Sequence, residues 1–359
     1  MRARVKLRGA ISGFGEVAAR AHLPGWRTRE DLSIVAVHEP VSARRHEALR
    51  LIKNVRVYDD LELMLDGEAL DFVDIASPPA LHAVAARAAL KSGAHVIVEK
   101  PLCLGLTEFD ALAHLARNNS RVLMCVHNWK FAPPYAAAHD AIAAGRLGAL
   151  RYAALDRFRV EPAGAGGAGA KWRASAETGG GILVDHGWHV FYLMRWLMGD
   201  ASPVAISARI ESGSRARGGG AGQARAAAGV AEDLADLRVV FSDGRLARAH
   251  LSWRAPARRT SAILYGDKGM LEIDDDRVTF TGRDGAREDL SRADAPDDSY
   301  HSAWFAAMAE AFEHAVAAGP GAAAATANLA EARDVLAMIV AARESAARDG
   351  VEIAIAVAG

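Results

Sequence analysis

The sequence has few cysteines, no excess of charge of either sign and no long apolar run. With only Cys103 and Cys125 among 359 residues, a disulfide framework or a multi-cysteine metal cluster is excluded, and a reducing cytoplasm is expected. The 43 Lys and Arg nearly balance the 44 Asp and Glu, which argues against nucleic acid or anionic membrane as partners. No segment approaches the roughly 18 uninterrupted apolar residues of a membrane helix. The first apolar stretch breaks at Ser12 and Gly13, too early for a signal peptide. The remaining expectation is that the protein acts on a small molecule.

Residues 1–126 alternate short β-type runs with Ala- and Leu-rich helical runs, the pattern of repeated βαβ units. Right-handed crossovers between parallel strands turn this pattern into a doubly wound, Rossmann-type domain. Helical spacing of small and apolar residues marks 84–91 and 109–117. The predicted strands are 8–12, 33–37, 72–76, 95–99 and 122–126.

Residues 127–359 have a different pattern, in which longer β-type segments follow one another without helices between them. This predicts a second, α+β domain with an open, mostly antiparallel sheet. Two helices at 302–318 and 328–347 carry apolar residues at core spacing, and core packing is their simplest interpretation. The Gly- and Ala-rich stretches 164–170 and 213–229 are predicted loops, the first of them a mobile lid. The predicted strands are 149–158, 205–210, 236–241, 245–253, 260–265 and 270–273.

The first strand is followed by G-x-G-x-x-A at residues 13–18, in the context where this motif binds a dinucleotide. Gly13 makes the tight turn, Gly15 lets the backbone approach a diphosphate, and Ala18 permits close packing of helix on strand. The N-terminus of the helix that begins here offers free N–H groups to the diphosphate. A glycine-rich turn without a ligand is the alternative interpretation of this motif alone. The predicted cofactor contacts are Gly13, Phe14, Gly15, Glu16 and Val17.

Glu39 ends the second strand, 21 residues past the last position of the motif, where a ribose-binding acid is expected. Its carboxylate would accept hydrogen bonds from a ribose 2′-hydroxyl and repel a 2′-phosphate, so NAD is favoured over NADP. Arg44 and Arg45 follow closely. They offer charge for a 2′-phosphate, although a solvated helix face explains them more simply.

Glu99 and Lys100 emerge from an apolar strand at its carboxyl end, the edge at which doubly wound sheets bind ligands. Pro101 favours extended geometry at Lys100 and so directs the side chain away from a helix. Taken alone, a Lys–Glu pair at the edge of a sheet is more often a surface salt bridge.

Asp185 and His189 follow three consecutive glycines and lie four residues apart, which places them on one face of a helix. A carboxylate beside an imidazole raises the proton affinity of the ring and fixes its orientation, as a general acid or base requires. Taken alone, this spacing is also common among helix-surface pairs.

Three blocks of the sequence together resemble the Gfo/Idh/MocA family of oxidoreductases, which includes glucose-fructose oxidoreductase and inositol dehydrogenase. They are GFGEVAARAHLP at 13–24, ASPPALHAVAARAALKSGAHVIVEKPL at 76–102 and GGGILVDHGWHVFYLMRWLMG at 179–199. The resemblance implies a Rossmann domain, a C-terminal domain often used for oligomerisation, and an active site between them. It implies catalysis by Lys100, Asp185 and His189. It implies further cofactor contacts at Ser77, Pro78, His82, Glu99, Lys100, Asn128, Trp172 and Arg173.

The roles implied by the resemblance are chemically consistent. His189 would accept the hydroxyl proton of a carbinol while its carbon gives a hydride to nicotinamide, and Lys100 would hydrogen-bond the oxygen. Asp185 would orient the base and stabilise its charge. The substrate contacts expected from this scheme are Lys100, Lys130, Arg173, Asp185 and His189.

Two features depart from the family pattern. Lys130 stands where many relatives carry arginine, and lysine lacks the bidentate fork of the guanidinium, which puts the substrate contact there in question. His186 adds a second imidazole beside Asp185, but no motif supplies a third ligand, so no metal is predicted.

The sequence thus predicts an NAD(P)-dependent dehydrogenase or reductase for a CH–OH group of a sugar, cyclitol or related polyol. A redox-neutral, NAD-dependent glycoside hydrolase and a non-catalytic dinucleotide sensor of the same fold remain open. The resemblance further implies a homodimer or homotetramer.

Overall fold

The structure is a computed structural model that describes residues 6–162, 172–176, 178–199, 201–213, 230–294 and 300–356. The chain forms two compact units, one of residues 1–131 with 295–332 and one of 132–294 with 333–359. Helix α9 (Ser302–Ala318) belongs to the first unit and α10 (Ala323–Ala347) contributes to both, whereas a division at residue 126 assigns both helices to the second domain. The predicted lid at 164–170, and residues 214–229 of the second predicted loop, lie outside the described residues.

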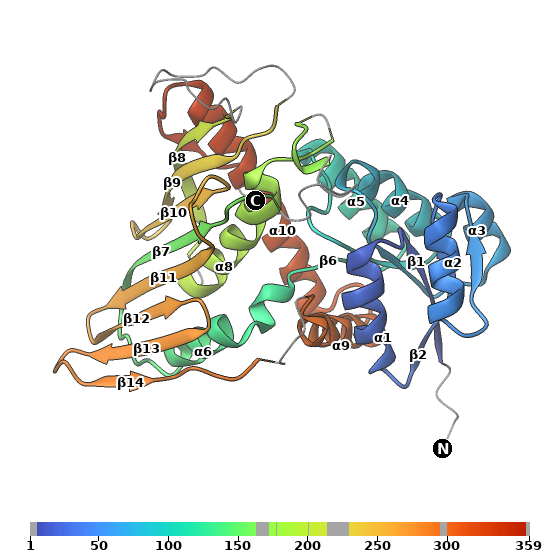
Figure 1. The fold of residues 1–359 in the computed structure, drawn as a ribbon, viewed down its shortest axis with the longest axis horizontal. Helices are drawn as coiled ribbons and strands as arrows, with labels where there is room; N and C mark the ends of the chain where they lie inside the picture. Colours follow the sequence, from blue (N-terminus) through green and yellow to red (C-terminus); the bar gives the residue numbers. More distant parts are fainter. Residues whose placement is uncertain are drawn as a thin grey trace. The chain divides into compact units, whose positions relative to one another are not determined.

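The first unit contains a parallel sheet whose strands, within the described part of the chain, run in the order β3-β2-β1-β4-β5-β6 (Figure 1). The strand order reverses between β1 and β4, the switch point at which such sheets bind ligands. This confirms the predicted Rossmann-type fold. The strands are β1 (Leu7–Ser12), β2 (Leu32–His38), β3 (Arg56–Tyr58), β4 (Phe72–Ile75), β5 (His95–Val98) and β6 (Leu123–Cys125).

Short helices connect these strands. The segment after the glycine turn is a π-helical turn, η1 (Ala18–His22), that continues into α1 (Leu23–Arg27). Strand β3 escaped the sequence analysis because it has three residues and none of them is fully buried. The other helices are α2 (Ser42–Leu51), α3 (Leu61–Gly67), α4 (Pro79–Lys91), α5 (Leu106–Asn118) and the 3₁₀ turn η2 (Asn128–Phe131).

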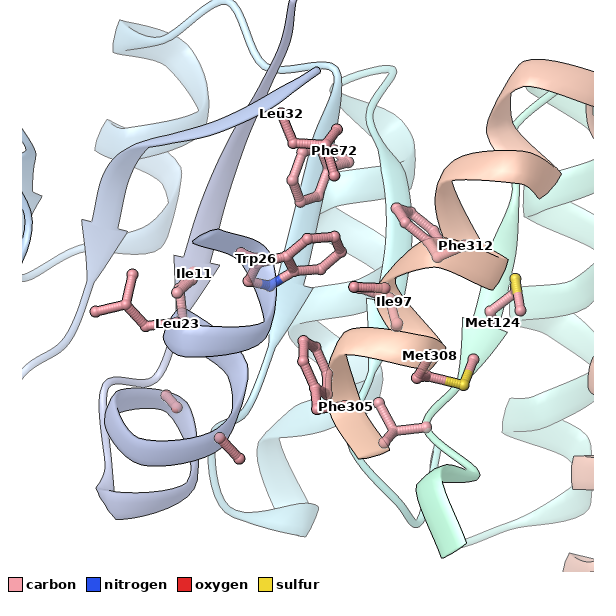
Figure 2. Close-up of a cluster of buried hydrophobic side chains, with 14 of the residues drawn as sticks. Ile11, Leu23, Trp26, Leu32, Phe72, Ile97, Met124, Phe305, Met308 and Phe312 are labelled. Atoms are coloured by element: carbon pink, nitrogen blue, oxygen red, sulfur yellow. The ribbon is translucent and has the colours of Figure 1, made fainter. Parts of the chain in front are cut away.

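The core of the first unit includes a cluster of aromatic rings contributed by distant parts of the chain. Phe305 and Phe312 of α9 point toward Trp26 of α1 and Phe72 of β4 (Figure 2). The ring centroid of Trp26 lies 5.4 Å from that of Phe305 and 4.9 Å from that of Phe72. Gly25 permits this approach, because a Cβ there would lie 2.7 Å from the Phe305 ring. Helix α9 is thereby an integral part of the first unit.

The second unit contains a mixed sheet, ordered β14-β13-β12-β11-β7-β10-β9-β8-β15 among the described residues (Figure 1). Its pairs are antiparallel except for β10 with β7, which confirms a mostly antiparallel sheet. The helices outside the sheet are α6 (Pro133–Ala143), the π-helical turn η3 (Leu183–Gly187) and α8 (Trp188–Met198). The strands are β7 (Leu150–Phe158), β8 (Pro203–Glu211), β9 (Leu234–Phe241), β10 (Leu246–Ser252), β11 (Arg259–Gly266), β12 (Gly269–Asp274), β13 (Arg277–Gly282), β14 (Arg287–Asp289) and β15 (Ile353–Ala354). In the described ranges, no helix combines the length and the apolar character needed to cross a bilayer.

Candidate active site

The glycine turn after β1 has a conformation that requires glycine. Gly13 adopts φ +90°, and its N–H donates to the carbonyl of His38 at 2.8 Å. A Cβ at Gly13 would lie 2.6 Å from the backbone N and Cα of Ser77. The turn therefore packs directly against the chain that leaves β4, at the switch point of the sheet.

Glu39 lies at the end of β2 and is tied to this turn. One carboxylate oxygen accepts the N–H of Phe14 at 2.8 Å and the other accepts the N–H of Val41 at 2.9 Å. The side chain is almost fully buried, and each oxygen retains a second lone pair for a ligand hydroxyl. The predicted ribose acid is thus held in place beside the motif.

The two arginines after Glu39 differ in their surroundings. Arg45 donates to the carbonyl oxygens of Glu39 and Pro40 at 2.7 and 2.8 Å, so it braces the loop. Arg44 extends over the turn, where its Nη1 lies 2.6 Å from the position that a Cβ of Gly15 would occupy. No carboxylate of the described residues pairs with the Arg44 guanidinium. This cation lies where a diphosphate would approach the motif.

The remaining residues of the motif contribute little beyond backbone. The side chain of Phe14 is fully buried and that of Val17 is partly exposed. Glu16 is exposed and pairs with Arg20 at 2.8 Å, one helical turn away. The cofactor contact predicted for the Glu16 side chain stays a prediction.

His82 joins the two loops that follow β4 and β5. Its ring nitrogens lie 2.7 Å from the carbonyl oxygen of Ser77 and 2.6 Å from that of Pro101. Burial lowers the pKa of His82, although both carbonyls favour the protonated ring. The ring therefore positions Ser77 and the turn after Lys100, while Pro78 lies exposed at the start of α4.

The first unit fits a dinucleotide by three independent features. Gly13 and Gly15 place no side chain on the turn, so the backbone of the motif can approach a ligand, and the Glu39 carboxylate stands at the ribose position. The Ser77 hydroxyl is buried without a hydrogen-bond partner among the described residues, as expected of a group that contacts a ligand.

Glu99 and Lys100 are consecutive residues directly after β5, and a hydrogen bond also connects them. One oxygen of the Glu99 carboxylate accepts the backbone N–H of Lys100 at 3.0 Å. The other oxygen lies 3.1 Å from Nε2 of His22, a residue of η1 that the sequence analysis did not single out as functional. Burial by itself raises the pKa of Glu99, but the hydrogen bond and charge of His22, with the charge of Lys100, lower it overall.

Lys130 and Asn128 lie together on η2, where both are partly buried. The ammonium of Lys130 donates to Glu331 at 2.7 Å, and Nδ1 of His127 lies 2.7 Å from the second oxygen of the same carboxylate. Burial raises the pKa of Glu331, yet its bonds to His127 and Lys130 lower it to about 2. Lys130 therefore has a structural partner, and its contact with substrate stays a prediction.

In the second unit, the glycine run lets the backbone at residues 180–181 pack directly against the backbone at residues 172–173. A Cβ at Gly180 would lie 2.2 Å from the carbonyl oxygen of Trp172, and Gly181 donates its N–H to Arg173 at 3.0 Å. Nε of Arg173 donates to the Asp185 carboxylate at 3.1 Å, and its guanidinium lies 4.4 Å from the Trp172 ring centre. The structure thus brings together the predicted residues Trp172, Arg173 and Asp185.

His189 is buried in the first turn of α8, directly after the π-helical turn that holds Asp185. Nδ1 of its ring lies 2.8 Å from the hydroxyl of Tyr192, and the two rings meet edge to face. Tyr192 is a partner that the sequence analysis missed, although the i, i+3 spacing on a helix is a signal that could have suggested it.

His186 points to the sheet. Its Nδ1 accepts the indole N–H of Trp253 at 2.9 Å, so a neutral ring carries its proton on Nε2. Over the described ranges, no group of three His, Cys, Asp or Glu side chains is arranged to hold a metal ion.

Two family models match the chain. Residues 7–127 match an oxidoreductase family with an NAD-binding Rossmann fold, and residues 135–272 match the Gfo/Idh/MocA C-terminal domain. The chain belongs to the Gfo/Idh/MocA family of oxidoreductases. The predicted family is thereby confirmed, as is the prediction of an enzyme that binds NAD through a Rossmann domain.

Characterised members of the Gfo/Idh/MocA family are similar over most of their length. The chain is 26% identical over 300 residues to D-glucoside 3-dehydrogenase of Escherichia coli, covering 82% of this chain and 84% of that enzyme. It is 28% identical over 295 residues to D-apiose dehydrogenase of Paraburkholderia graminis, covering 79% and 72%. An inositol dehydrogenase homologue of Azotobacter vinelandii, solved with NADH and myo-inositol, shares the fold with a TM-score of 0.78 at 21% identity over 97% of both chains. These relatives lend no support to the glycoside hydrolase or the sensor.

Proposed function

We propose that this enzyme is an NAD-dependent dehydrogenase that interconverts a CH–OH group and a ketone of a sugar, cyclitol or related polyol. The observation that carries the proposal is the buried imidazole of His189, held by Tyr192 and preceded by the turn that bears Asp185. A fixed imidazole suits proton transfer because its unperturbed pKa, about 6.5, lies near neutral pH.

Each polar residue has a defined role in the proposed reaction. His189 accepts the proton of the substrate hydroxyl, and Lys100 donates a hydrogen bond to the same oxygen, where negative charge develops. Asp185 stabilises the charge that His189 acquires, and Arg173 holds the Asp185 carboxylate. Bound NAD supplies the acceptor for the hydride that leaves the carbinol carbon. In the opposite direction the same groups deliver the proton to a ketone.

The preference for NAD over NADP is proposed from Glu39. Its charge would repel a 2′-phosphate, and its position beside the N–H of Phe14 suits a ribose hydroxyl. Arg44, next to Gly15, would lie near the diphosphate, which NAD and NADP share.

The substrate class is proposed from the relatives. Their names state dehydrogenation of D-apiose and of D-glucosides, and a homologue of the same fold was solved with myo-inositol. The protein is further proposed to work in the cytoplasm as a homodimer or homotetramer.

The decisive experiment mixes purified protein and NAD with a panel of sugars, cyclitols and nucleotide sugars and follows NADH by absorbance. We expect turnover of one substrate group, and a loss of about 10²-fold or more in kcat for Lys100→Ala. Lys53→Ala, at an exposed position of the same unit, serves as the matched control and should retain full activity. Absence of NADH across the panel, in protein that binds NADH, would contradict the proposal.

A further inference from the structure

His22 lies between a buried and a partly buried carboxylate at the carboxyl ends of neighbouring strands. Its Nδ1 is 2.9 and 3.0 Å from the two oxygens of Asp74 on β4, and its Nε2 is 3.1 Å from Glu99, just after β5. The imidazole is 1% exposed and Asp74 is fully buried. Three ionisable side chains thus form one row inside the nucleotide-binding unit.

The surrounding residues hold this row rigidly. The Phe305 ring of α9 stacks on the imidazole at a centroid distance of 3.8 Å and an angle of 12°. The indole N–H of Trp26 donates to Asp74 at 2.7 Å. His22 therefore has no room to rotate, and its hydrogen-bond directions are set by the fold.

The geometry requires a protonated ring. A neutral imidazole has one N–H and can donate to only one carboxylate, whereas an imidazolium donates to both. Burial by itself lowers the pKa of His22, but the charges and hydrogen bonds of Asp74 and Glu99 raise it to about 9. At neutral pH His22 is therefore protonated between the two carboxyl groups, and the charge of Lys100 also acts on Glu99.

The row of His22, Asp74 and Glu99 ends next to Lys100, the residue proposed to contact the substrate oxygen. The Glu99 oxygen that does not face His22 accepts the backbone N–H of Lys100. We propose that His22 is a positioning residue for the dehydrogenase reaction. It binds the Glu99 oxygen that does not contact the Lys100 amide, and it thereby fixes the backbone from which the Lys100 side chain extends. This inference rests on the proposed function of Lys100.

Loss of the His22 charge has a specific consequence. Without the imidazolium behind it, the partly buried Glu99 carboxylate loses a charged hydrogen-bond donor, while the charge of Lys100 still acts on it. Glu99 would then compete with the substrate for Lys100. Asp74 of β4 acts on His22, and Lys100 after β5 and His82 of α4 act on Glu99. Cys125 of β6 and His127 just after it are the other titratable groups coupled to Glu99 among the described residues.

The test compares His22→Gln with the wild type and with His95→Gln. His95 lies at the opposite end of β5, where its Nδ1 accepts the N–H of Val122, so it is a matched histidine remote from Lys100. Hydrogen exchange of the Lys100 amide, measured by NMR on the NAD complex, needs no substrate. We expect exchange at least 10-fold faster in His22→Gln and unchanged in His95→Gln.

Activity gives a second readout. We expect His22→Gln to lower kcat about 10-fold with less than a 2-fold change in the KM for NAD. Activity of the wild type should fall as the pH rises through about 9, and this step should be missing in the variant. An unchanged Lys100 exchange rate in folded His22→Gln would overturn the inference. If this variant does not fold, His22→Gln is combined with Asp74→Asn, which removes one charge of each sign. The exchange rate of the Lys100 amide in the double variant then tests the inference.

The two proposals fail in distinguishable ways. A wild type that oxidises no polyol contradicts the dehydrogenase, while the amide exchange still reports whether His22 fixes the Lys100 backbone. A wild type that turns over, with a His22→Gln variant of equal kcat and equal pH profile, contradicts only the role of His22.

Discussion

The hydroxyl of Tyr192 lies 2.8 Å from Nδ1 of His189, one turn earlier on the same helix. Both side chains are buried, so the bond persists without competition from water and sets the plane of the imidazole. Partners of this kind orient a histidine in the way that hydrogen-bonded groups orient the histidine ligands of metals. In the proposed reaction, this bond would hold the ring in the orientation that proton transfer requires.

Tyr192→Phe removes this bond with little change in shape. We expect kcat to fall about 10-fold, because the ring loses a fixed orientation, with unchanged affinity for NADH. Tyr152→Phe is the control, since Tyr152 stacks on Tyr265 in the sheet. Steady-state kinetics and NADH fluorescence measure both values. Equal kcat for Tyr192→Phe and the wild type would show that other contacts orient His189.

Gly13→Ala should disrupt the nucleotide site and weaken the binding of NADH. Its φ of +90° is unfavourable for alanine, and the new Cβ would overlap the backbone of Ser77. We expect destabilisation by more than about 1 kcal/mol and a loss of NADH affinity of at least about 10-fold. Gly105→Ala is the control, because a Cβ there meets nothing within 4 Å and its φ is not positive. Calorimetric titration with NADH measures the effect, and retained affinity in Gly13→Ala would rule out this site.

Glu39→Ser should relax the selectivity between the two nicotinamide cofactors. The change removes the charge that repels a 2′-phosphate and two backbone contacts of the carboxylate. We expect kcat/KM for NAD to fall about 10-fold or more, and the NADP to NAD ratio to rise. Adding Arg44→Ala should weaken both cofactors if its guanidinium contacts the diphosphate. A ratio unaffected by Glu39→Ser would contradict the proposed preference.

Glu331 should contribute to stability in a pH-dependent way. Its pKa is lowered to about 2 in the folded chain, so its stabilisation is complete above the ordinary value of about 4.5 and is lost as the pH falls toward 2. Such a shift corresponds to roughly 3 kcal/mol at neutral pH. We expect Glu331→Gln to lower the free energy of unfolding at pH 7, and the difference from the wild type to shrink below pH 4.5.

Urea unfolding at several pH values measures this difference. Glu62→Gln, at an exposed position of α3, should have almost no effect at any of them. A difference between Glu331→Gln and the wild type that is constant from pH 7 to pH 3 would refute the role of His127 and Lys130 in holding the Glu331 charge.

Much of the nucleotide-binding unit could be predicted from local sequence. The glycine turn, Glu39 and the charged end of β5 each follow from short-range rules of strand period, turn chemistry and spacing. The predicted strands of this unit differ from those observed by at most one residue at each end. Asp185 and Arg173 were both singled out, but their ion pair depends on how Gly180 and Gly181 let two segments meet.

Local sequence is enough to identify the reactive groups and the type of each domain, because period and motif act over a few residues. Which of these groups lie close enough to shift one another's pKa depends on the packing of distant segments. His22 meets Asp74 and Glu99 across 52 and 77 residues, and Phe305 covers it from a helix near the end of the chain. Such contacts carry no local signal, since the burial that shifts a pKa and the donors that satisfy a carboxylate exist only after distant segments pack together.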